Sequence, residues 1–168
     1  EGAVGLGHTL LATTPEAVKE RVPLVHSQTG CVITADVRLD NRADILPYLD
    51  DLKRRPRNEI GDAEIILHAY LRFGDECPTR LLGDFAFAIW DPRHHRLFCA
   101  RDHMGMRQLI YHHDPGKLFA FATEPRALLV NQDIPYRINE ARIADFLVQE
   151  LEGVDTTCTF FDNVMRLP

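Results

Sequence analysis

The pattern of hydrophobic and polar positions is clearest over residues 81–129, where it predicts four consecutive strands followed by a helix. Residues 85–90 (FAFAIW) form the first of these strands and are apolar at every position. A strand without a polar face has to be covered on both sides. Its large side chains are therefore expected in the core, namely Phe85, Phe87, Ile89 and Trp90.

Two turns divide this region into hairpins. Asp91-Pro92 and the charged run after it end the first strand, and residues 97–100 begin the return strand. Residues 109–112 and 118–122 flank the sequence Asp114-Pro115-Gly116-Lys117, whose proline and glycine favour a tight turn. We expect these strands to be antiparallel neighbours in one sheet.

The pattern upstream of this region predicts shorter elements. They are strands over residues 2–11, 22–25 and 31–37, and a short helix capped by Thr14 with Pro15 in its first turn. In the third strand, apolar positions 33, 35 and 37 alternate with positions 32, 34 and 36. Thr34 and Asp36 therefore share a partly polar face.

Helical spacing of apolar residues predicts the remaining elements. The first is a helix over residues 41–49, capped by Asn41 and broken or bent at Pro47. The others are helices over residues 63–73 (preceded by Asp62 and ended by Gly74), 78–82, 124–130, and 140–151 (capped by Asn139). The core side of the last helix is expected to hold Ile143, Phe146, Leu147 and Leu151, with Gly153 beyond its end. Residues 156–168 are expected to be extended. In this order the elements indicate one α+β domain with antiparallel strands and covering helices.

Composition and charge narrow the classes of function. The 168 residues are 45% hydrophobic and 26% charged, which is typical of one globular domain with a core. The formal net charge of −6 and the scattered basic residues argue against a nucleic-acid partner. No apolar run is long enough to cross a bilayer and no signal-peptide pattern opens the chain, so we expect no membrane contact and a cytoplasmic location.

Neither the cysteines nor the histidines predict a metal site. The four cysteines have no CxxC spacing and are expected to be reduced and structural: Cys31, Cys77, Cys99 and Cys158. The pairs His94-His95 and His112-His113 consist of adjacent residues, whose side chains point to opposite sides, and no acidic residue has ligand spacing to them. We expect no metal in this domain.

Four motifs occur in order along most of the chain. They are residues 62–70 (DAEIILHAY), 82–91 (LGDFAFAIWD), 100–107 (ARDHMGMR) and 121–128 (FATEPRAL). Together they resemble the glutaminase domain of asparagine synthase, a class II glutamine amidotransferase of the N-terminal nucleophile hydrolase family. The resemblance extends from Gly5-Leu-Gly-His8 to Val164-Met-Arg-Leu-Pro168. It implies a four-layer αββα sandwich of two antiparallel sheets.

The resemblance also implies partners for this domain. A downstream synthetase domain would use ATP and Mg²⁺ to activate the side chain of aspartate and would receive ammonia released from glutamine. Residues 1–168 cover only the first domain, so its expected partners are glutamine and that synthetase domain, and no cofactor is expected within it. The first strand of the family fold is expected to be missing, which leaves a sheet edge open to pairing in a homodimer.

The family's reaction requires four groups, and the sequence can be checked for each. An N-terminal cysteine attacks the glutamine amide, but this chain opens at Glu1 with no cysteine near it. An Asn-Gly-Glu motif holds the oxyanion, and this chain has Thr34-Ala35-Asp36 at that place. An arginine that pairs with the substrate carboxylate is replaced by Leu10, whereas the aspartate that holds the amino group is matched by Asp62.

Each glutamine-binding candidate has a structural alternative. Asp62 is equally expected as the N-cap of its helix, where any aspartate is favourable. Thr34, Ala35 and Asp36 could belong to an ordinary strand with one solvated face. Residues 101–103 lie where a charged turn follows a strand, so a structural pairing role is expected for them.

Two hypotheses for the function follow. In the first, the chain is the glutamine-hydrolysing half of an asparagine synthase and supplies ammonia for amidation of aspartate. In the second, it is a catalytically degenerate module that docks an ATP-dependent amide-forming domain, as in relatives similar to β-lactam synthetases or peptide cyclases. The residues at positions 10 and 34–36 favour the second hypothesis for the chemistry of this domain.

Overall fold

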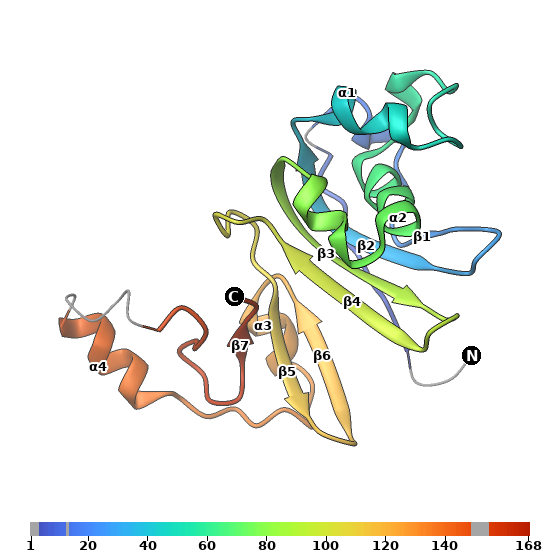
Figure 1. Ribbon diagram of the computed structural model, residues 1–168. Coiled ribbons are helices and arrows are strands. Elements are labelled where there is room, and N and C mark those ends of the chain that lie inside the picture. Colours follow the sequence, from blue (N-terminus) through green and yellow to red (C-terminus); the bar gives the residue numbers. More distant parts are fainter. Residues whose placement is uncertain (1–3, 13, 149–154) are drawn as a thin grey trace. The chain divides into compact units, whose positions relative to one another are not determined.

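The computed structural model describes residues 4–12, 14–148 and 155–168. The chain divides into two compact units, Glu1–Arg107 and Gln108–Pro168, each with its own sheet (Figure 1). The α+β class with two antiparallel sheets is therefore confirmed, whereas the four-layer stacking stays a prediction.

The sheet of the first unit contains four antiparallel strands in the order β1-β2-β3-β4. The strands are β1 (Leu24–Val25), β2 (Val32–Leu39), β3 (Gly83–Asp91) and β4 (Arg96–Arg101). Ala35 of β2 lies opposite Phe87 of β3, which in turn lies opposite Ala100 of β4. The two longest strands are thus neighbours, and they carry most of the sheet's buried residues.

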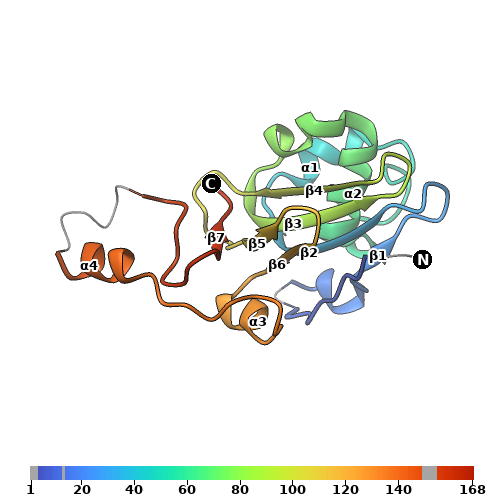
Figure 2. The same cartoon turned by 90° about the horizontal axis from the view of Figure 1, so that it is seen from below.

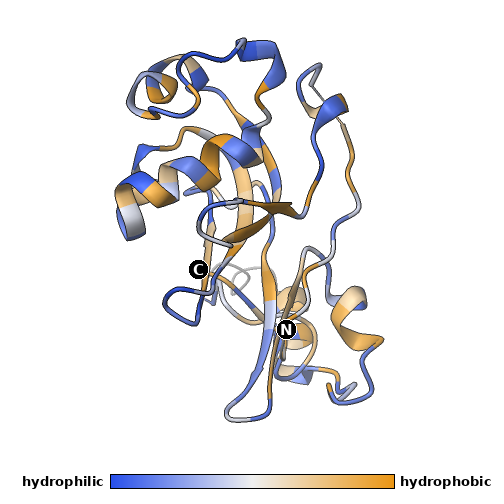
Figure 3. Cartoon of the chain, turned by 90° about the vertical axis from the view of Figure 1, so that its right-hand side faces the viewer, coloured by the Kyte–Doolittle hydropathy of each residue, from blue (hydrophilic) through white to orange (hydrophobic). Residues whose placement is uncertain are grey.

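Helix α2 (Asp62–Phe73) packs on this sheet and completes the larger core. Its apolar residues recur every three or four positions, so hydrophobic and hydrophilic stretches alternate along the helix (Figure 3). Ile65, Ile66 and Ala69 are fully buried and pack in one cluster with Phe85 and Phe87. Helices α1 and α2 lie on the same face of the sheet in both views (Figures 1 and 2).

Short helical segments connect the elements of the first unit. They are the α-helix α1 (Arg42–Ile45) and the 3₁₀ helices η1 (Ala17–Lys19), η2 (Leu46–Tyr48), η3 (Arg57–Glu59) and η4 (Gly74–Arg80). The hydroxyl of Thr14 accepts a hydrogen bond from the backbone N–H of Ala17, the first residue of η1, at 3.2 Å, although the N-cap position itself is occupied by Glu16. Helix α1 ends at Ile45, and the chain continues as η2, which contains Pro47 as its second residue; this change of helix type confirms the predicted break or bend at Pro47. Asn41 occupies the predicted N-cap position of α1, but its side chain makes no capping hydrogen bond, because it donates to Arg80 C=O and accepts from Leu82 N–H.

The second unit has a smaller sheet in the order β6-β5-β7. Its elements are β5 (Ile110–Asp114), β6 (Leu118–Ala122), α3 (Pro125–Leu129), α4 (Glu140–Val148) and β7 (Met165–Arg166). Ile110, Leu128, Ile134 and Val164 form its buried cluster. Residues 155–168 are otherwise irregular, so the predicted extended tail is confirmed only at β7.

Three predictions about strands were wrong. The four central strands do not share one sheet, because the chain turns at Asp102 after β4, and β5 then pairs with β6 and β7 among the described strands. Residues 4–11 form no strand, and the rest of the predicted segment lies outside the described residues. Trp90 is half-buried rather than in the core, because at the end of β3 it faces two half-buried neighbours, Val32 and Leu97.

The last helix, α4, begins where it was predicted, but the side chains expected on its core side are not buried. Asn139 caps α4 by accepting a hydrogen bond from the backbone N–H of Arg142 at 3.0 Å. The residues expected on its core side, Ile143, Phe146 and Leu147, are instead exposed by 37%, 48% and 74%. The helix extends away from the sheet of its own unit, so that sheet does not cover its apolar side (Figures 1 and 2). Residues 151 and 153 lie outside the described residues.

Candidate functional site

Thr34 lies in the middle of β2, and its hydroxyl contacts residues 7 and 8. Its hydroxyl oxygen is 3.2 Å from Nδ1 of His8, and the hydroxyl can donate to the carbonyl of Gly7 at 3.4 Å. Only 6% of Thr34 is exposed. These contacts place the Gly7-His8 pair beside the strand segment that the sequence predicts to hold an oxyanion.

Ala35 and Asp36 differ in their surroundings. Ala35 is buried in the core cluster opposite Phe87, so its side chain faces away from the polar side of β2. Asp36 keeps 41% of its side chain exposed and lies 3.5 Å from the guanidinium of Arg107. Burial lowers the pKa of His8, and the negative charge of Asp36 opposes that effect. His8, Thr34, Asp36 and Arg107 thus form one polar group of side chains.

Asp102 positions the loop that carries Arg107. Its carboxylate accepts hydrogen bonds from the backbone N–H groups of Met106 and Arg107, both at 2.9 Å, and of Phe85 at 3.3 Å. Burial disfavours its charged form, but these hydrogen bonds outweigh burial and lower the pKa of Asp102. The structural role predicted for residues 101–103 is therefore confirmed for Asp102.

Asp62 is the best match to the family motif, and it is paired within the chain. Its carboxylate accepts hydrogen bonds from the guanidinium of Arg42 and from the backbone N–H of Leu39, the latter at 2.9 Å. Arg42 also donates to the carbonyl of Ile60 at 2.7 Å. With only 5% of Asp62 exposed, this carboxylate joins the end of β2 to α1 and α2.

The interpretation of Asp62 as a helix N-cap is wrong. The N-cap residue of α2 is Gly61, and a backbone N–H in the first turn of the helix, that of Ala63, donates to the carboxylate of Glu20 at 2.8 Å. Burial raises the pKa of Glu20, and its hydrogen bond with Ala63 opposes that shift. Asp62 has no capping role because it points back toward β2.

The candidates do not converge on one point. Asp62 contacts β2 at Leu39, five positions beyond Thr34, and five residues of a strand span about 16 Å. Leu10, which replaces the family's arginine, is 39% exposed and offers no charge to a substrate carboxylate. The structure therefore groups Thr34 with Asp36, and groups Asp62 with Arg42 instead.

None of the chain's four cysteines, all of them described, is an activated thiol. Burial raises the pKa of Cys77 to about 12 and that of Cys99 to about 11, and it also raises the pKa of Cys31. A hydrogen bond to Asp155 raises the pKa of Cys158. All four are free cysteines, as predicted. A nucleophilic thiolate therefore does not come from these four residues.

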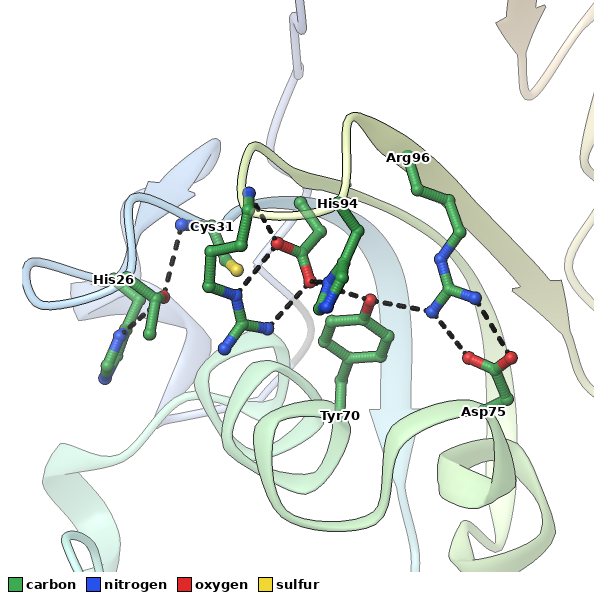
Figure 4. Close-up of polar contacts among 9 residues, drawn as sticks. His26, Cys31, Tyr70, Asp75, His94 and Arg96 are labelled. Atoms are coloured by element: carbon green, nitrogen blue, oxygen red, sulfur yellow. Dashed lines mark hydrogen bonds and ion pairs between the residues drawn. The ribbon is translucent and has the colours of Figure 1, made fainter.

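The adjacent histidines are used separately. His94 bonds the carboxylate of Asp91 at 3.0 Å, and His112 bonds the carbonyl of Asn163 at 2.8 Å. Figure 4 shows His94 in a polar network at the turn after β3, where the hydroxyl of Tyr70 donates to Asp91 and accepts a bond from Arg96. The His94 contact supports this hairpin, whereas the His112 contact joins β5 to the segment before β7.

Sequence comparison identifies the family. Residues 1–168 match the model of the glutamine amidotransferase domain along their whole length. The chain belongs to that family. Curated relatives named as glutamine-hydrolyzing asparagine synthetases confirm the resemblance seen in the four motifs. No helix in the described part of the chain combines the length and apolar character needed to span a membrane.

Three relatives show how much of the chain is similar. A protein of Methanocaldococcus jannaschii, assigned by name to the glutamine-hydrolyzing asparagine synthetases, is 27% identical over 98% of this chain. Asparagine synthetase (glutamine-hydrolyzing) 3 of Bacillus subtilis is 36% identical over 50% of it, and amidase chry2 of Gibberella zeae is 28% identical over 98%. The matched regions make up 34%, 14% and 23% of those proteins, so the chain spans about a third of the length of the first and less of the other two.

Several contacts in this region could not be found from the sequence alone. Arg42 belongs to a predicted helix, and nothing in its neighbours shows that it reaches Asp62, twenty positions later. The sequence shows His8 as part of a Gly-His pair and does not show its contact with Thr34. Three residues far apart in the sequence, His26, Asp51 and His68, also come together.

Proposed function

We propose that this amidotransferase domain serves as a structural docking module for an ATP-dependent amide-forming domain and does not itself hydrolyse glutamine. The partner domain would bind ATP and Mg²⁺ and would choose the acceptor substrate. Within residues 1–168, the proposal requires no cofactor. Association with a second copy of the chain stays a prediction.

The pairing of Asp62 with Arg42 is the observation that carries this proposal. The family resemblance assigns Asp62 to the amino group of glutamine, a cation that needs an open carboxylate. In this chain a guanidinium and a backbone N–H already occupy that carboxylate, and the pair is largely buried. Displacing Arg42 would leave its charge without a partner, which is costly at a buried site.

The oxyanion position supports the same proposal. Threonine is shorter than the asparagine of the family motif, and the hydroxyl of Thr34 is already bonded to His8 and Gly7. An oxyanion hole works through donors that are free and aimed at the developing charge. Thr34 therefore stabilises the packing of residues 7–8 on β2 and is unsuited to hold an oxyanion.

Glutamine hydrolysis is the second candidate function. It is favoured by family membership and by the relatives that are named glutamine-hydrolyzing asparagine synthetases. In that case a cysteine outside residues 1–168 would supply the nucleophile, and glutamine would be the domain's substrate.

The test is ammonia release by the full-length protein. Under the docking proposal, incubation with glutamine releases no ammonia above a protein-free blank, whereas ATP-dependent amide formation proceeds with free ammonium or an amine. Ammonia release that is abolished by alkylation of an N-terminal cysteine would overturn the proposal and establish the second candidate.

A further inference from the structure

His26, Asp51 and His68 come from three separate segments of the first unit. His26 follows β1, Asp51 follows η2, and His68 lies on α2. Each offers one ligand atom, and the three atoms all lie within 4.8 Å of one another. Residues separated by 25 and 17 positions are thus brought to one point by the packing of β1 and α2.

The distances are close to those of a metal site. Ligands about 2.1 Å from a tetrahedral zinc ion are about 3.4 Å apart. Nδ1 of His68 is 3.6 Å from a carboxylate oxygen of Asp51, and the two imidazole rings meet edge to face with centroids 5.1 Å apart. Asp51 has 71% of its side chain exposed, so it can shift toward an ion without repacking the core.

The orientation of His26 is fixed by a second contact. Its Nδ1 lies 2.9 Å from the hydroxyl oxygen of Thr29, which also accepts a bond from the backbone N–H of Cys31 at 3.3 Å (Figure 4). This contact leaves Nε2 of His26 as the free ring nitrogen. Metal-binding histidines are commonly held in this way, with one ring nitrogen bonded to the protein and the other to the metal.

The three side chains open into a cavity of about 280 Å³. Its lining includes Ser27, Gln28 and Glu64. Glu64 is paired with Arg55 at 2.6 Å, so that pair adds no net charge and Asp51 leaves the site negative. The cavity has room for an ion with a bound water molecule, and its charge favours a cation.

We propose that His26, His68 and Asp51 bind one divalent transition-metal ion, with water at the remaining position. Two imidazole nitrogens and one carboxylate oxygen suit Zn²⁺ and neighbouring first-row ions and are a poor set for Mg²⁺ or Ca²⁺. The ion joins β1, the segment after η2 and α2, and so it stabilises the fold of the first unit. This proposal is independent of whether the domain hydrolyses glutamine.

The experiment is a calorimetric titration of the metal-free full chain with Zn²⁺, with Mg²⁺ as a comparison. The variants are His68→Ala and Asp51→Asn, and the matched control is His103→Ala, which removes an exposed histidine. We expect one Zn²⁺ per chain, an affinity at least tenfold lower in both variants, and no change in the control. We also expect Zn²⁺ to raise the melting temperature of the native chain.

Two results would overturn the proposal. One is Zn²⁺ binding that is equally tight in the native chain, Asp51→Asn and His68→Ala, because such binding would come from surface histidines. The other is the absence of saturable binding in the native chain. Asp51→Asn keeps the test valid if His68→Ala does not fold, because Asp51 is exposed.

Discussion

The carboxylate of Asp62 pairs with the guanidinium of Arg42 across the junction of β2, α1 and α2. The same guanidinium donates to the backbone carbonyls of Arg57 and Ile60, so one side chain holds the start of α2 against the end of β2. Asp62, the residue that best matches the family's substrate-binding motif, is thus part of a contact that stabilises the fold. The docking proposal follows from this arrangement.

Replacement of Arg42 tests the structural role of this pair. Arg42→Ala leaves the buried Asp62 with only the N–H of Leu39, and we expect the free energy of unfolding to fall by about 1.5–3 kcal/mol. Urea unfolding of the native chain and the variant measures this change in the free energy of unfolding. The control is Lys53→Ala, which removes an exposed partner of Asp50 and should change stability by less than about 0.5 kcal/mol. Equal effects of the two variants would show that the pair is not structural.

The two faces of β3 can be compared by alanine substitution. Phe87 is 1% exposed and packs with Phe85 and Phe98, so Phe87→Ala should destabilise the domain by about 3–5 kcal/mol. Trp90→Ala should cost less, because Trp90 is half-buried at the end of the strand. Thermal or urea unfolding of both variants shows which substitution causes the larger loss of stability. A larger loss for Trp90→Ala would contradict the burial described for this strand.

Acid should destabilise the domain partly through Asp91. Hydrogen bonds from Arg93 chiefly, with His94 and Tyr70, lower the pKa of Asp91 below its ordinary value of 3.8. A lowered pKa in the folded state means that the unfolded chain takes up the proton first, so this contribution is present above about pH 4 and is lost as the pH falls. Urea unfolding from about pH 7 to about pH 3 should show it. Asp91→Asn should have a weaker pH dependence, and an unchanged one would refute this assignment.

The reactivity of the cysteines tests their surroundings. Because the pKa of Cys77 is about 12 rather than 9.0, its thiolate fraction near neutral pH is roughly a thousandfold below that of an ordinary thiol. Iodoacetamide should modify Cys77 and the fully buried Cys31 only after unfolding, as mass spectrometry of the peptides can show. Rapid modification of either in the native chain would contradict their burial.

The sequence predicted the fold well where the pattern was local. The apolar run of β3, the turn at Asp91-Pro92, the amphipathic helix α2 and the glycine that ends it, Gly74, all appear as predicted. The burial of α4 could not be predicted, because amphipathic spacing shows which side of a helix is apolar and not whether anything packs on it.

The candidate site was harder to predict, because its properties depend on long-range contacts. The departure of Thr34 and Leu10 from the family motif could be predicted, because it depends on residue identity alone and not on which residues surround them. The pairing of Asp62 with Arg42, and the grouping of His26 with Asp51 and His68, depend on which segments the fold brings together.

The most direct test of the central claim is a calorimetric titration of the full chain with glutamine, up to about 10 mM, which is above the usual range of KM values. The account predicts no saturable binding, because Arg42 already occupies the carboxylate of Asp62. Saturable binding that is lost in Asp62→Asn and kept in Asp114→Asn would contradict it, since the carboxylate would then be available to the substrate.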